Sequence, residues 1–354
     1  MSKRIIALLL ALVMVFALCA CGNGGNGGNS AGSEDVGDET YTIRIACENS
    51  DSYPATLGLY QMEKYVESHT NGKVQVEVCA SGQLGGEEET LEQVAQGNLE
   101  MAVASFAPVV SYVPEFEVMD IPFVYNSYTE AWMVLDSYVG TNLLDKMEAQ
   151  GLKGMAYMEN GMRQVTSNVS AINSIADFKG VKLRTMQNNN HMESFSALGA
   201  NPTPVAFSEL YISLSQKVVA AQENPIANVT DKKLYEVQKY LSLTNHIYDA
   251  MPLVCNLEFF NSLPQAYQKV VQAGAIYAQE FSRFCNLERE DLILADLADK
   301  YGMQINEVSA DARAEMAKVA QPAVIKLVAK DIGQDAVDQY MNDVKDVLAQ
   351  ISKF

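Results

Sequence analysis

Short β-branched segments alternate with helical segments along the first half of the chain, and this alternation restricts the fold more than any other feature. The segments that predict strands are Tyr41–Ala46, Lys73–Cys79, Leu99–Ser105, Lys153–Met158 and Val181–Thr185. Between the first two, residues 57–68 carry apolar side chains at helical spacing. Because parallel strands are joined by such helical crossovers, the sequence predicts an α/β fold with mostly parallel sheets flanked by helices.

The length of the chain and its C-terminal half extend this prediction. The 354 residues exceed what one hydrophobic core usually organises, so we expect two lobes. Residues 263–301 are compatible with helix almost throughout, because their only proline, Pro264, stands at the start. The sequence therefore predicts two lobes and a long helix toward the C-terminus.

The N-terminus carries a targeting segment. Two basic residues precede an unbroken apolar run of 16 residues, Ile5–Ala20, which is too short for a transmembrane helix and is typical of a signal peptide. The run leads into Leu18-Cys19-Ala20-Cys21, which resembles the lipobox of bacterial lipoproteins. We expect residues 1–20 to be a lipoprotein signal peptide and Cys21 to carry the lipid. An ordinary secretory signal with incidental cysteines is the alternative.

The segment that begins at Cys21 cannot form a core. Residues 22–40 contain seven glycines in 19 positions, and this composition predicts a flexible tether over residues 21–40. The mature chain would carry 23 basic and 44 acidic side chains, a net charge of −21, which argues against nucleic acid or anionic lipid as a partner. No second run of 18 apolar residues follows. The predicted location is extracytoplasmic, with the lipid anchor as the only membrane contact.

Cysteine and histidine usage predicts neither a metal site nor a cofactor. Four cysteines follow the lipobox, at positions 47, 79, 255 and 285, without CxxC spacing or a nearby histidine. A disulfide between Cys47 and Cys79 is compatible with their places at strand ends, but small buried thiols are the favoured interpretation. The histidines, at positions 69, 191 and 246, are scattered along the sequence and are interpreted as surface or packing residues.

Residues 161–225 contain the candidate binding residues. Arg184 ends the segment 177–184, in which Gly180 turns the chain before a short strand. In open α/β sheets ligands collect beyond the carboxyl ends of the strands, and arginine offers two parallel N–H donors to a carboxylate. The alternative is a solvated arginine at a strand edge. Without further information, the physical argument from the sequence favours this alternative. No GxSxG, HExxH or P-loop motif is present, so we expect a binding protein and not an enzyme.

The same region resembles the solute-binding proteins of tripartite ATP-independent periplasmic (TRAP) transporters, the DctP family, and is closest in pattern to the sialic-acid-binding members. The resemblance covers residues 41–320, and its motifs are Arg163-Gln-Val-Thr-Ser-Asn168, Lys179-Gly-Val-Lys-Leu-Arg184 and Gln222-Glu-Asn-Pro225. It implies that Arg184 pairs with the ligand carboxylate, that Arg163 supports the carboxylate and that Asn224 hydrogen-bonds it. Phe207 matches an aromatic residue that lines the pocket, with core packing as the alternative.

Departures from the family pattern bear on the ligand. Ala220-Ala221 replaces the usual Asp-Gly ahead of Asn224. Glu87 stands at an acidic position that binds ligand hydroxyls in the sialic-acid binders. Glu48 or Asn49 falls at the position of an asparagine in those proteins. Ser105 and Pro108, by contrast, replace a charged pair of the sialic-acid binders. The resemblance therefore implies an organic acid ligand. A sugar acid (uronate, aldonate or sialic-acid-like) is favoured over a C4-dicarboxylate.

The resemblance also implies how the chain is divided and which partner it serves. In a periplasmic-binding-protein-like fold, lobe I would comprise residues 41–160 and about 250–289, and lobe II residues 161–249 and about 290–354. The ligand cleft would lie between the lobes, and the long helix would span both. The closed form would be recognised by TRAP permease subunits driven by an ion gradient. A receptor that feeds a sensor kinase is the alternative.

Overall fold

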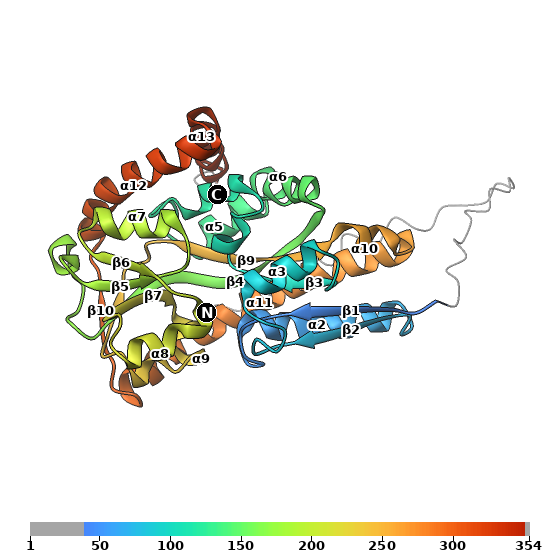
Figure 1. The fold of residues 1–354 in the computed structure, drawn as a ribbon, viewed down its shortest axis with the longest axis horizontal. Helices are drawn as coiled ribbons and strands as arrows, with labels where there is room; N and C mark the ends of the chain where they lie inside the picture. Colours follow the sequence, from blue (N-terminus) through green and yellow to red (C-terminus); the bar gives the residue numbers. More distant parts are fainter. Residues whose placement is uncertain (1–38, 351–354) are drawn as a thin grey trace, which may run out of the picture. The chain divides into compact units, whose positions relative to one another are not determined.

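The computed structural model describes residues 39–350, and within them ten strands form one hydrogen-bonded network (Figure 1). The main path runs β2-β1-β3-β9-β4-β7-β5-β6, and β8, which pairs with β4, carries β10 at its other edge. The strands are β1 Tyr41–Ala46, β2 Val74–Cys79, β3 Met101–Val103, β4 Leu152–Ser167, β5 Lys182–Thr185, β6 Asn201–Pro204, β7 Ala221–Pro225, β8 Tyr240–Leu243, β9 Tyr248–Asn256 and β10 Gln304–Glu307.

The pairing of the strands is parallel toward both ends of the path and antiparallel in its middle. β1 pairs in parallel with β2 and β3, β5 with β6 and β7, and β10 with β8. The long strands β4 and β9 run antiparallel to each other and to their other partners. The predicted α/β fold with mostly parallel strands is therefore confirmed, and the antiparallel pair β4–β9 joins its two parallel parts.

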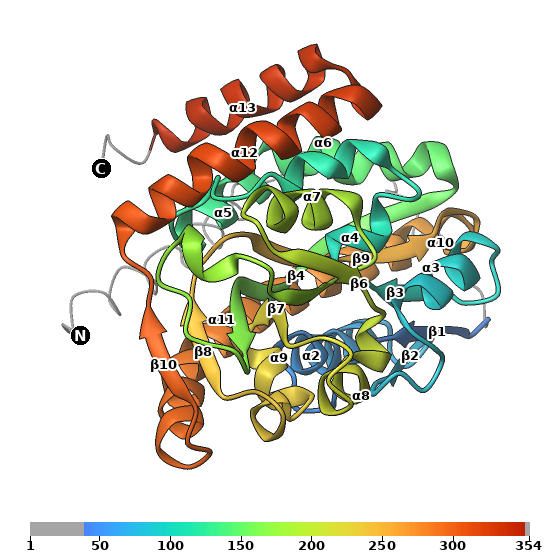
Figure 2. The same cartoon turned by 60° about the vertical axis from the view of Figure 1, so that its left-hand side comes forward.

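Helices cover both faces of this network. They are α2 Pro54–His69, α3 Glu87–Ala95, α4 Phe106–Val109, α5 Tyr128–Leu135, α6 Tyr138–Lys146, α7 Asn189–Ala197, α8 Leu210–Ser215, α9 Ile226–Asp231, α10 Leu257–Ser262, α11 Gln265–Asp299, α12 Ala310–Ile332 and α13 Gln334–Leu348. Figure 2 shows α12 and α13 side by side next to α5, α6 and α7, with α2, α8 and α9 on the opposite side of the strands.

Strand β4 extends far beyond the segment that the sequence predicts. The prediction covers residues 153–158, whereas β4 continues to Ser167, because Glu159, Asn160 and Gln164 interrupt the apolar pattern and are nevertheless buried. Up to Met162 the strand pairs with β9, and beyond it with β7 and β8. One continuous strand thus connects the two parallel parts of the network.

The predicted long helix is α11, which has 35 residues and packs against α2, β4 and α9. Its approach to α2 is close because Gly58 has no side chain. A Cβ atom at Gly58 would lie 2.5 Å from the carbonyl oxygen of Ala278 and 2.8 Å from Cε of Met158. The contact between α2 and α11 therefore depends on a glycine at position 58.

The hydrophobic core is divided among several clusters, one of which includes the last helix. Val337 and Val344 of α13 share a cluster with Val134 of α5, Leu152 of β4 and Val254 of β9. The family resemblance predicts that residues from about 290 to 354 belong to lobe II, whereas these contacts attach α13 to residues expected in lobe I. The lobe boundaries themselves stay a prediction.

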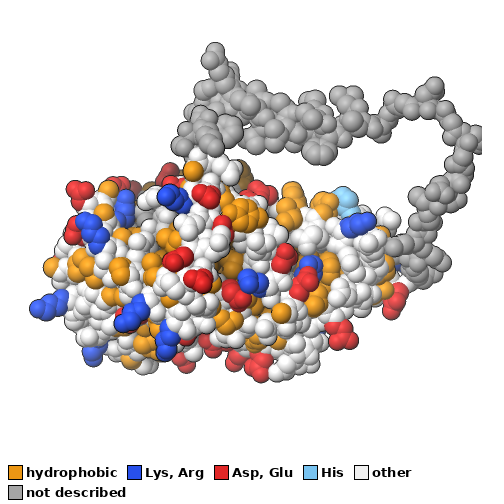
Figure 3. Space-filling view, turned by 90° about the horizontal axis from the view of Figure 1, so that it is seen from above, with side chains coloured by type: hydrophobic (Ala, Val, Ile, Leu, Met, Phe, Trp, Pro, Cys, Tyr) orange, Lys and Arg blue, Asp and Glu red, His pale blue; other side chains and the backbone are white. Residues whose placement is uncertain are grey.

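The predicted signal peptide, the Cys21 lipidation site and the tether up to residue 38 lie outside the described residues. Within residues 39–350, no helix is long and apolar enough to cross a membrane. On the face shown in Figure 3, Lys and Arg side chains are interspersed with Asp and Glu.

Candidate functional site

A cavity of about 350 Å³ lies where the ends of strands and helices from both parts of the network meet. Its wall includes Glu48 after β1, Glu87 at the start of α3, Arg184 of β5 and Phe207 after β6. A smaller inner cavity shares Glu87 and Phe207 and adds Asn49, Ser105, Asn160, Asn224 and Asn228. The structure thus brings seven of the eight predicted ligand-binding residues, all but Arg163, to the walls of two adjoining cavities.

Arg184 is the buried cation of the outer cavity. Its side chain is held in β5, next to β6 and β7, and is only 1 % exposed. Nε donates to the carbonyl oxygen of Val205 at 2.8 Å, whereas Nη1 has no hydrogen-bond partner among the described residues. Burial lowers the pKa of Arg184 to about 10, which leaves the guanidinium charged at neutral pH. A buried charge without a direct partner is costly, and an anion in the cavity would offset that cost.

Arg163, by contrast, is already paired. It is fully buried in β4, where Nε donates to the Glu223 carboxylate at 2.5 Å and Nη1 to Asp249 at 2.6 Å. Nη2 donates to Oδ1 of Asn224 at 3.2 Å. The charge of Arg163 is therefore balanced within the protein, and its nearest link to the cavity is Asn224, which lines the inner part.

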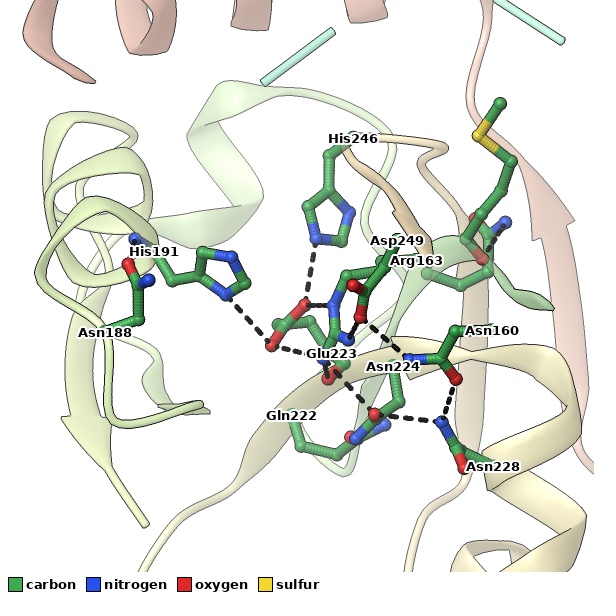
Figure 4. A network of polar contacts seen from close by, with 12 residues as sticks. Asn160, Arg163, Asn188, His191, Gln222, Glu223, Asn224, Asn228, His246 and Asp249 are labelled. Atoms are coloured by element: carbon green, nitrogen blue, oxygen red, sulfur yellow. Dashed lines mark hydrogen bonds and ion pairs between the residues drawn. The ribbon is translucent and has the colours of Figure 1, made fainter. Parts of the chain in front are cut away.

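Two histidines face the same Glu223 carboxylate (Figure 4). Nε2 of His246 lies 3.2 Å from Glu223, while His191 lies 3.2 Å from Asp120 and 3.9 Å from Glu223. Burial by itself would lower the pKa of His191, but the two carboxylates raise it to about 9. Burial would raise the pKa of Glu223, but Arg163 and the histidines hold it well below its usual range.

The interpretation of these histidines as surface or packing residues agrees with their exposure and burial, but it does not include the ionic network that His191 and His246 join. Both are buried and belong to one ionic network, whereas His69 is exposed on α2. No local pattern links these residues, because His246 lies 23 positions after Glu223 and His191 lies 32 positions before it. The pairing of β4 with β7 and β9 brings His246 to Glu223, and α7, which follows β5 beside β7, carries His191.

Glu87 and Glu48 form an acidic wall of the cavity that Arg184 also lines. Oε1 of Glu87 accepts hydrogen bonds from the backbone N–H and the hydroxyl of Ser105, at 3.1 and 2.9 Å. Oε2 of Glu48 accepts from the backbone N–H of Glu87 at 3.2 Å, and its Oε1 has no partner among the described residues. Burial raises the pKa of Glu87 to about 8, and it also raises the pKa of Glu48.

Amide side chains connect the floor of the inner cavity. Asn49 donates to Asn228 at 3.0 Å, and Asn228 donates to Asn160 at 3.1 Å. Asn224 donates to Gln222 at 2.6 Å and accepts from Arg163. These bonds fix the orientation of the amides, so that Asn224 and Asn49 hold defined positions in the cavity wall.

Lys232 is a neighbour of the cavity that the sequence analysis missed. Its Nζ lies 4.5 Å from the centre of the Phe207 ring and donates to the carbonyl oxygen of Glu48 at 3.4 Å. No local pattern distinguishes it, because it stands in a polar run with Asp231 and Lys233. Phe207 is half-buried, and it both lines the cavity and packs against the core cluster that contains Leu210 and Leu214.

The four cysteines at positions 47, 79, 255 and 285 are free and buried. The backbone N–H of Cys47 donates to the carbonyl oxygen of Cys79 at 3.0 Å, so the two residues are neighbours without being bridged. The favoured interpretation as buried thiols is confirmed. Within residues 39–350, no group of three or more His, Cys, Asp or Glu side chains is arranged to hold a metal ion.

Comparisons with known proteins agree on one family. Residues 45–331 match the family model of DctP, described as bacterial extracellular solute-binding protein, family 7. The C4-dicarboxylate-binding periplasmic protein DctP of Rhodobacter capsulatus is 31% identical over 302 residues, which are 84% of this chain and 90% of that protein.

Two solved structures share the fold. The sugar acid binding protein DctPAm of Advenella mimigardefordensis, in complex with galactonate, aligns with a TM-score of 0.83 and 31% identity over 87% of this chain and 99% of its own. A TRAP periplasmic solute-binding protein of Polaromonas, bound to D-erythronate, aligns with a TM-score of 0.80 and 33% identity over 85% of this chain and 98% of its own.

Proposed function

Because this chain belongs to the DctP family, family 7 of the bacterial extracellular solute-binding proteins, we propose that its solute is a sugar acid whose carboxylate binds Arg184. Proteins of this family bind small organic acids and work with TRAP permeases, and they are receptors and not enzymes. The proposal concerns which acid this chain takes and which residues hold it.

The observation that carries the proposal is the unpaired guanidinium of Arg184. It is buried, it lines the cavity, and its Nη1 has no partner among residues 39–350. A ligand carboxylate satisfies this group because it supplies, in direct contact, the acceptor that Nη1 lacks. Asn224 lies beside the inner cavity, where it offers an amide to the same carboxylate, and Arg163 supports Asn224 through a 3.2 Å hydrogen bond.

The acidic wall favours a sugar acid. Sugar hydroxyls donate to carboxylates and amides, and Glu87, Glu48 and Asn49 offer such acceptors along the cavity. A second carboxylate on the ligand would instead approach Glu48 and Glu87, where like charges repel. A C4-dicarboxylate is the second candidate, because the Rhodobacter capsulatus relative is named for that ligand.

A sialic-acid-like ligand is the least favoured of the sugar acids. Ser105 is occupied by Glu87, to which it donates from both its N–H and its hydroxyl, and it stands where the sialic-acid binders carry charge. We infer that uronates and aldonates, which are smaller, suit the cavity of about 350 Å³ better.

We further propose that Cys21 is lipidated, and that the chain is held outside the cytoplasm at the membrane where it delivers the acid to TRAP permease subunits. The sequence at residues 18–21 supports the anchor. Mass spectrometry of the protein isolated from membranes tests it: a diacylglyceryl modification on Cys21 is expected, and an unmodified N-terminus cleaved elsewhere would contradict it.

The ligand is tested by thermal shift of the fragment 41–354 against uronates, aldonates, sialic acids, C4-dicarboxylates and 2-oxoacids. Binding to the folded state alone raises the melting temperature, and the largest rise is expected with a uronate or aldonate. Arg184→Ala should weaken binding by about 2–5 kcal/mol, the usual effect of removing one partner of a buried charge pair.

The matched control is Arg44→Ala, which removes an arginine from another strand. Arg44 pairs with Glu100 at 2.8 Å and lines neither cavity, so its loss should leave the ligand-induced shift unchanged. A shift with succinate alone would favour the C4-dicarboxylate, and a shift with sialic acid alone would contradict the interpretation of Ser105. An unchanged affinity in Arg184→Ala would contradict the proposal that the ligand carboxylate binds Arg184.

A further inference from the structure

We propose that Glu48 and Glu87 together retain one proton when the organic anion is bound, so that solute binding is coupled to proton binding. The inference rests on the proposed function, because it presumes that the cavity takes an organic acid. Glu48 and Glu87 would then contribute to specificity in addition to Arg184, because the charge of this acidic wall changes when the ligand binds.

The two carboxyl groups are held together by the fold. Glu48 follows β1 and Glu87 begins α3, and the backbone N–H of Glu87 donates to Oε2 of Glu48 at 3.2 Å. Ser105 fixes Oε1 of Glu87 with two hydrogen bonds. Oε1 of Glu48 is buried without a partner among the described residues, and both side chains line the outer cavity. Neither carboxyl group can swing into bulk solvent without losing these contacts.

Charges from every surrounding element act on this pair. Arg184 of β5 and Lys232 at the end of α9 attract negative charge. Negative charge is opposed by Asp249 of β9, by Glu209 in the cavity wall, by Glu88 and Glu89 on α3, and by Cys47 if it ionises. The pair therefore stands among two cations and several acids, and its two ionised carboxylates would already balance Arg184 and Lys232.

An arriving carboxylate upsets that balance. It brings a third negative charge to a buried site with two nearby cations, and uncompensated charge is expensive at low dielectric. A proton on the pair restores neutrality. Burial and the neighbouring Glu48 already raise the pKa of Glu87 to about 8, and a bound anion favours the protonated form still further. Arg184 is not the group that adjusts, because it stays charged at neutral pH.

The retained proton also has a recognition role. A protonated carboxyl group donates one hydrogen bond and still accepts others, so the pair can both donate to and accept from the hydroxyls of a sugar acid. A dianion would require a second proton on Glu48. The site therefore discriminates by charge, and monoanionic acids are favoured over dianions at neutral pH.

The experiment is isothermal titration calorimetry of the fragment 41–354 with galactonate between pH 6 and 9.5, in buffers of different ionisation enthalpy. The dissociation constant should be nearly constant below pH 8 and rise about tenfold per pH unit above it. The dependence of the binding enthalpy on the ionisation enthalpy of the buffer gives the number of protons taken up. This number should approach one proton per galactonate near pH 9. If galactonate is not the tightest ligand of the thermal panel, the tightest monoanion replaces it.

Variants identify the groups involved. Glu87→Gln should abolish the pH dependence of the dissociation constant and the proton uptake, because an amide does not titrate. The matched control Glu92→Gln removes an exposed carboxylate from the same helix, and it should retain the full dependence. If Glu87→Gln does not fold, Glu48→Gln provides the second variant. The carboxyl ¹³C resonances of glutamate-labelled parent protein should then include one that titrates near pH 8.

The outcomes separate the two proposals. Binding of an acid with the same dissociation constant from pH 6 to pH 9.5 and no buffer dependence overturns the proton coupling and leaves the proposed function intact. Retention of the full pH dependence in Glu87→Gln and Glu48→Gln overturns it as well. No binding of any acid at any pH overturns both.

Discussion

Arg163 and Arg184 are buried in the same region, but among residues 39–350 carboxylates pair only with Arg163. Arg163 contacts Glu223 and Asp249, whereas Arg184 donates to the carbonyl oxygen of Val205. The two positive charges also repel each other, which contributes to the low pKa of Arg184. The first arginine therefore serves the fold, and the second is left with an unsatisfied donor at the cavity.

Arg163→Met should destabilise the protein by about 3–5 kcal/mol, because it strands the buried carboxylates of Glu223 and Asp249. Urea denaturation at pH 7 measures this effect. Lys318→Met removes the lysine of an exposed pair with Glu315, where the expected loss is about 0–1 kcal/mol. Equal losses in both variants would show that the buried network contributes no more than a surface ion pair.

Arg184→Met should have the opposite effect on the ligand-free protein. Removing an unpaired buried charge relieves a desolvation cost, so the free energy of unfolding should stay unchanged or rise by up to about 2 kcal/mol. The same variant should lose the ligand-induced rise in melting temperature. Thermal unfolding with and without galactonate measures both effects, and a large loss of stability without ligand would mean that Arg184 has a partner within the protein.

The protein should become less stable at alkaline pH, because His191 loses its stabilising proton there. The pKa of His191 is raised to about 9 in the folded protein, above the ordinary value of about 6.5. The stabilisation is therefore complete below about pH 6.5 and is lost as the pH rises through 9, by roughly 3 kcal/mol at most.

Denaturation curves recorded from pH 6 to pH 9.5 measure this loss. His191→Gln should flatten the decline over that range, whereas His69→Gln, on the exposed end of α2, should not alter it. An identical decline in the parent and in His191→Gln would assign the titration to other groups.

The fragment 41–354 should contain four thiols that react only after unfolding. Cys47, Cys79, Cys255 and Cys285 are buried and free, and burial raises the pKa of Cys47 to about 11, so its reactive thiolate is scarce. Titration with a thiol reagent in denaturant should give four equivalents and a slow reaction in the native state. Two equivalents would instead indicate a Cys47–Cys79 disulfide.

The sequence alone predicted the elements with strong local patterns. The alternation in YTIRIA and KVQVEVC and the helical spacing that follows the first of them correspond to β1, β2 and α2. The apolar run from 153 to 158 was recognised, but its continuation to Ser167 was not, because Glu159, Asn160 and Gln164 are polar and their burial depends on partners distant in the chain.

The candidate site shows the same division. The motifs around Arg184, Asn224 and Phe207 identified residues that do line the cavities, since each motif is local. Sequence could not distinguish the paired Arg163 from the unpaired Arg184, nor find His191, His246 or Lys232, because a charge is satisfied or stranded by its spatial neighbours. The sequence by itself determined the fold class, the family and the candidate arginines. Only the tertiary structure decided which arginine is free for a ligand, because pairing energies depend on distances between strands and not on positions along the chain.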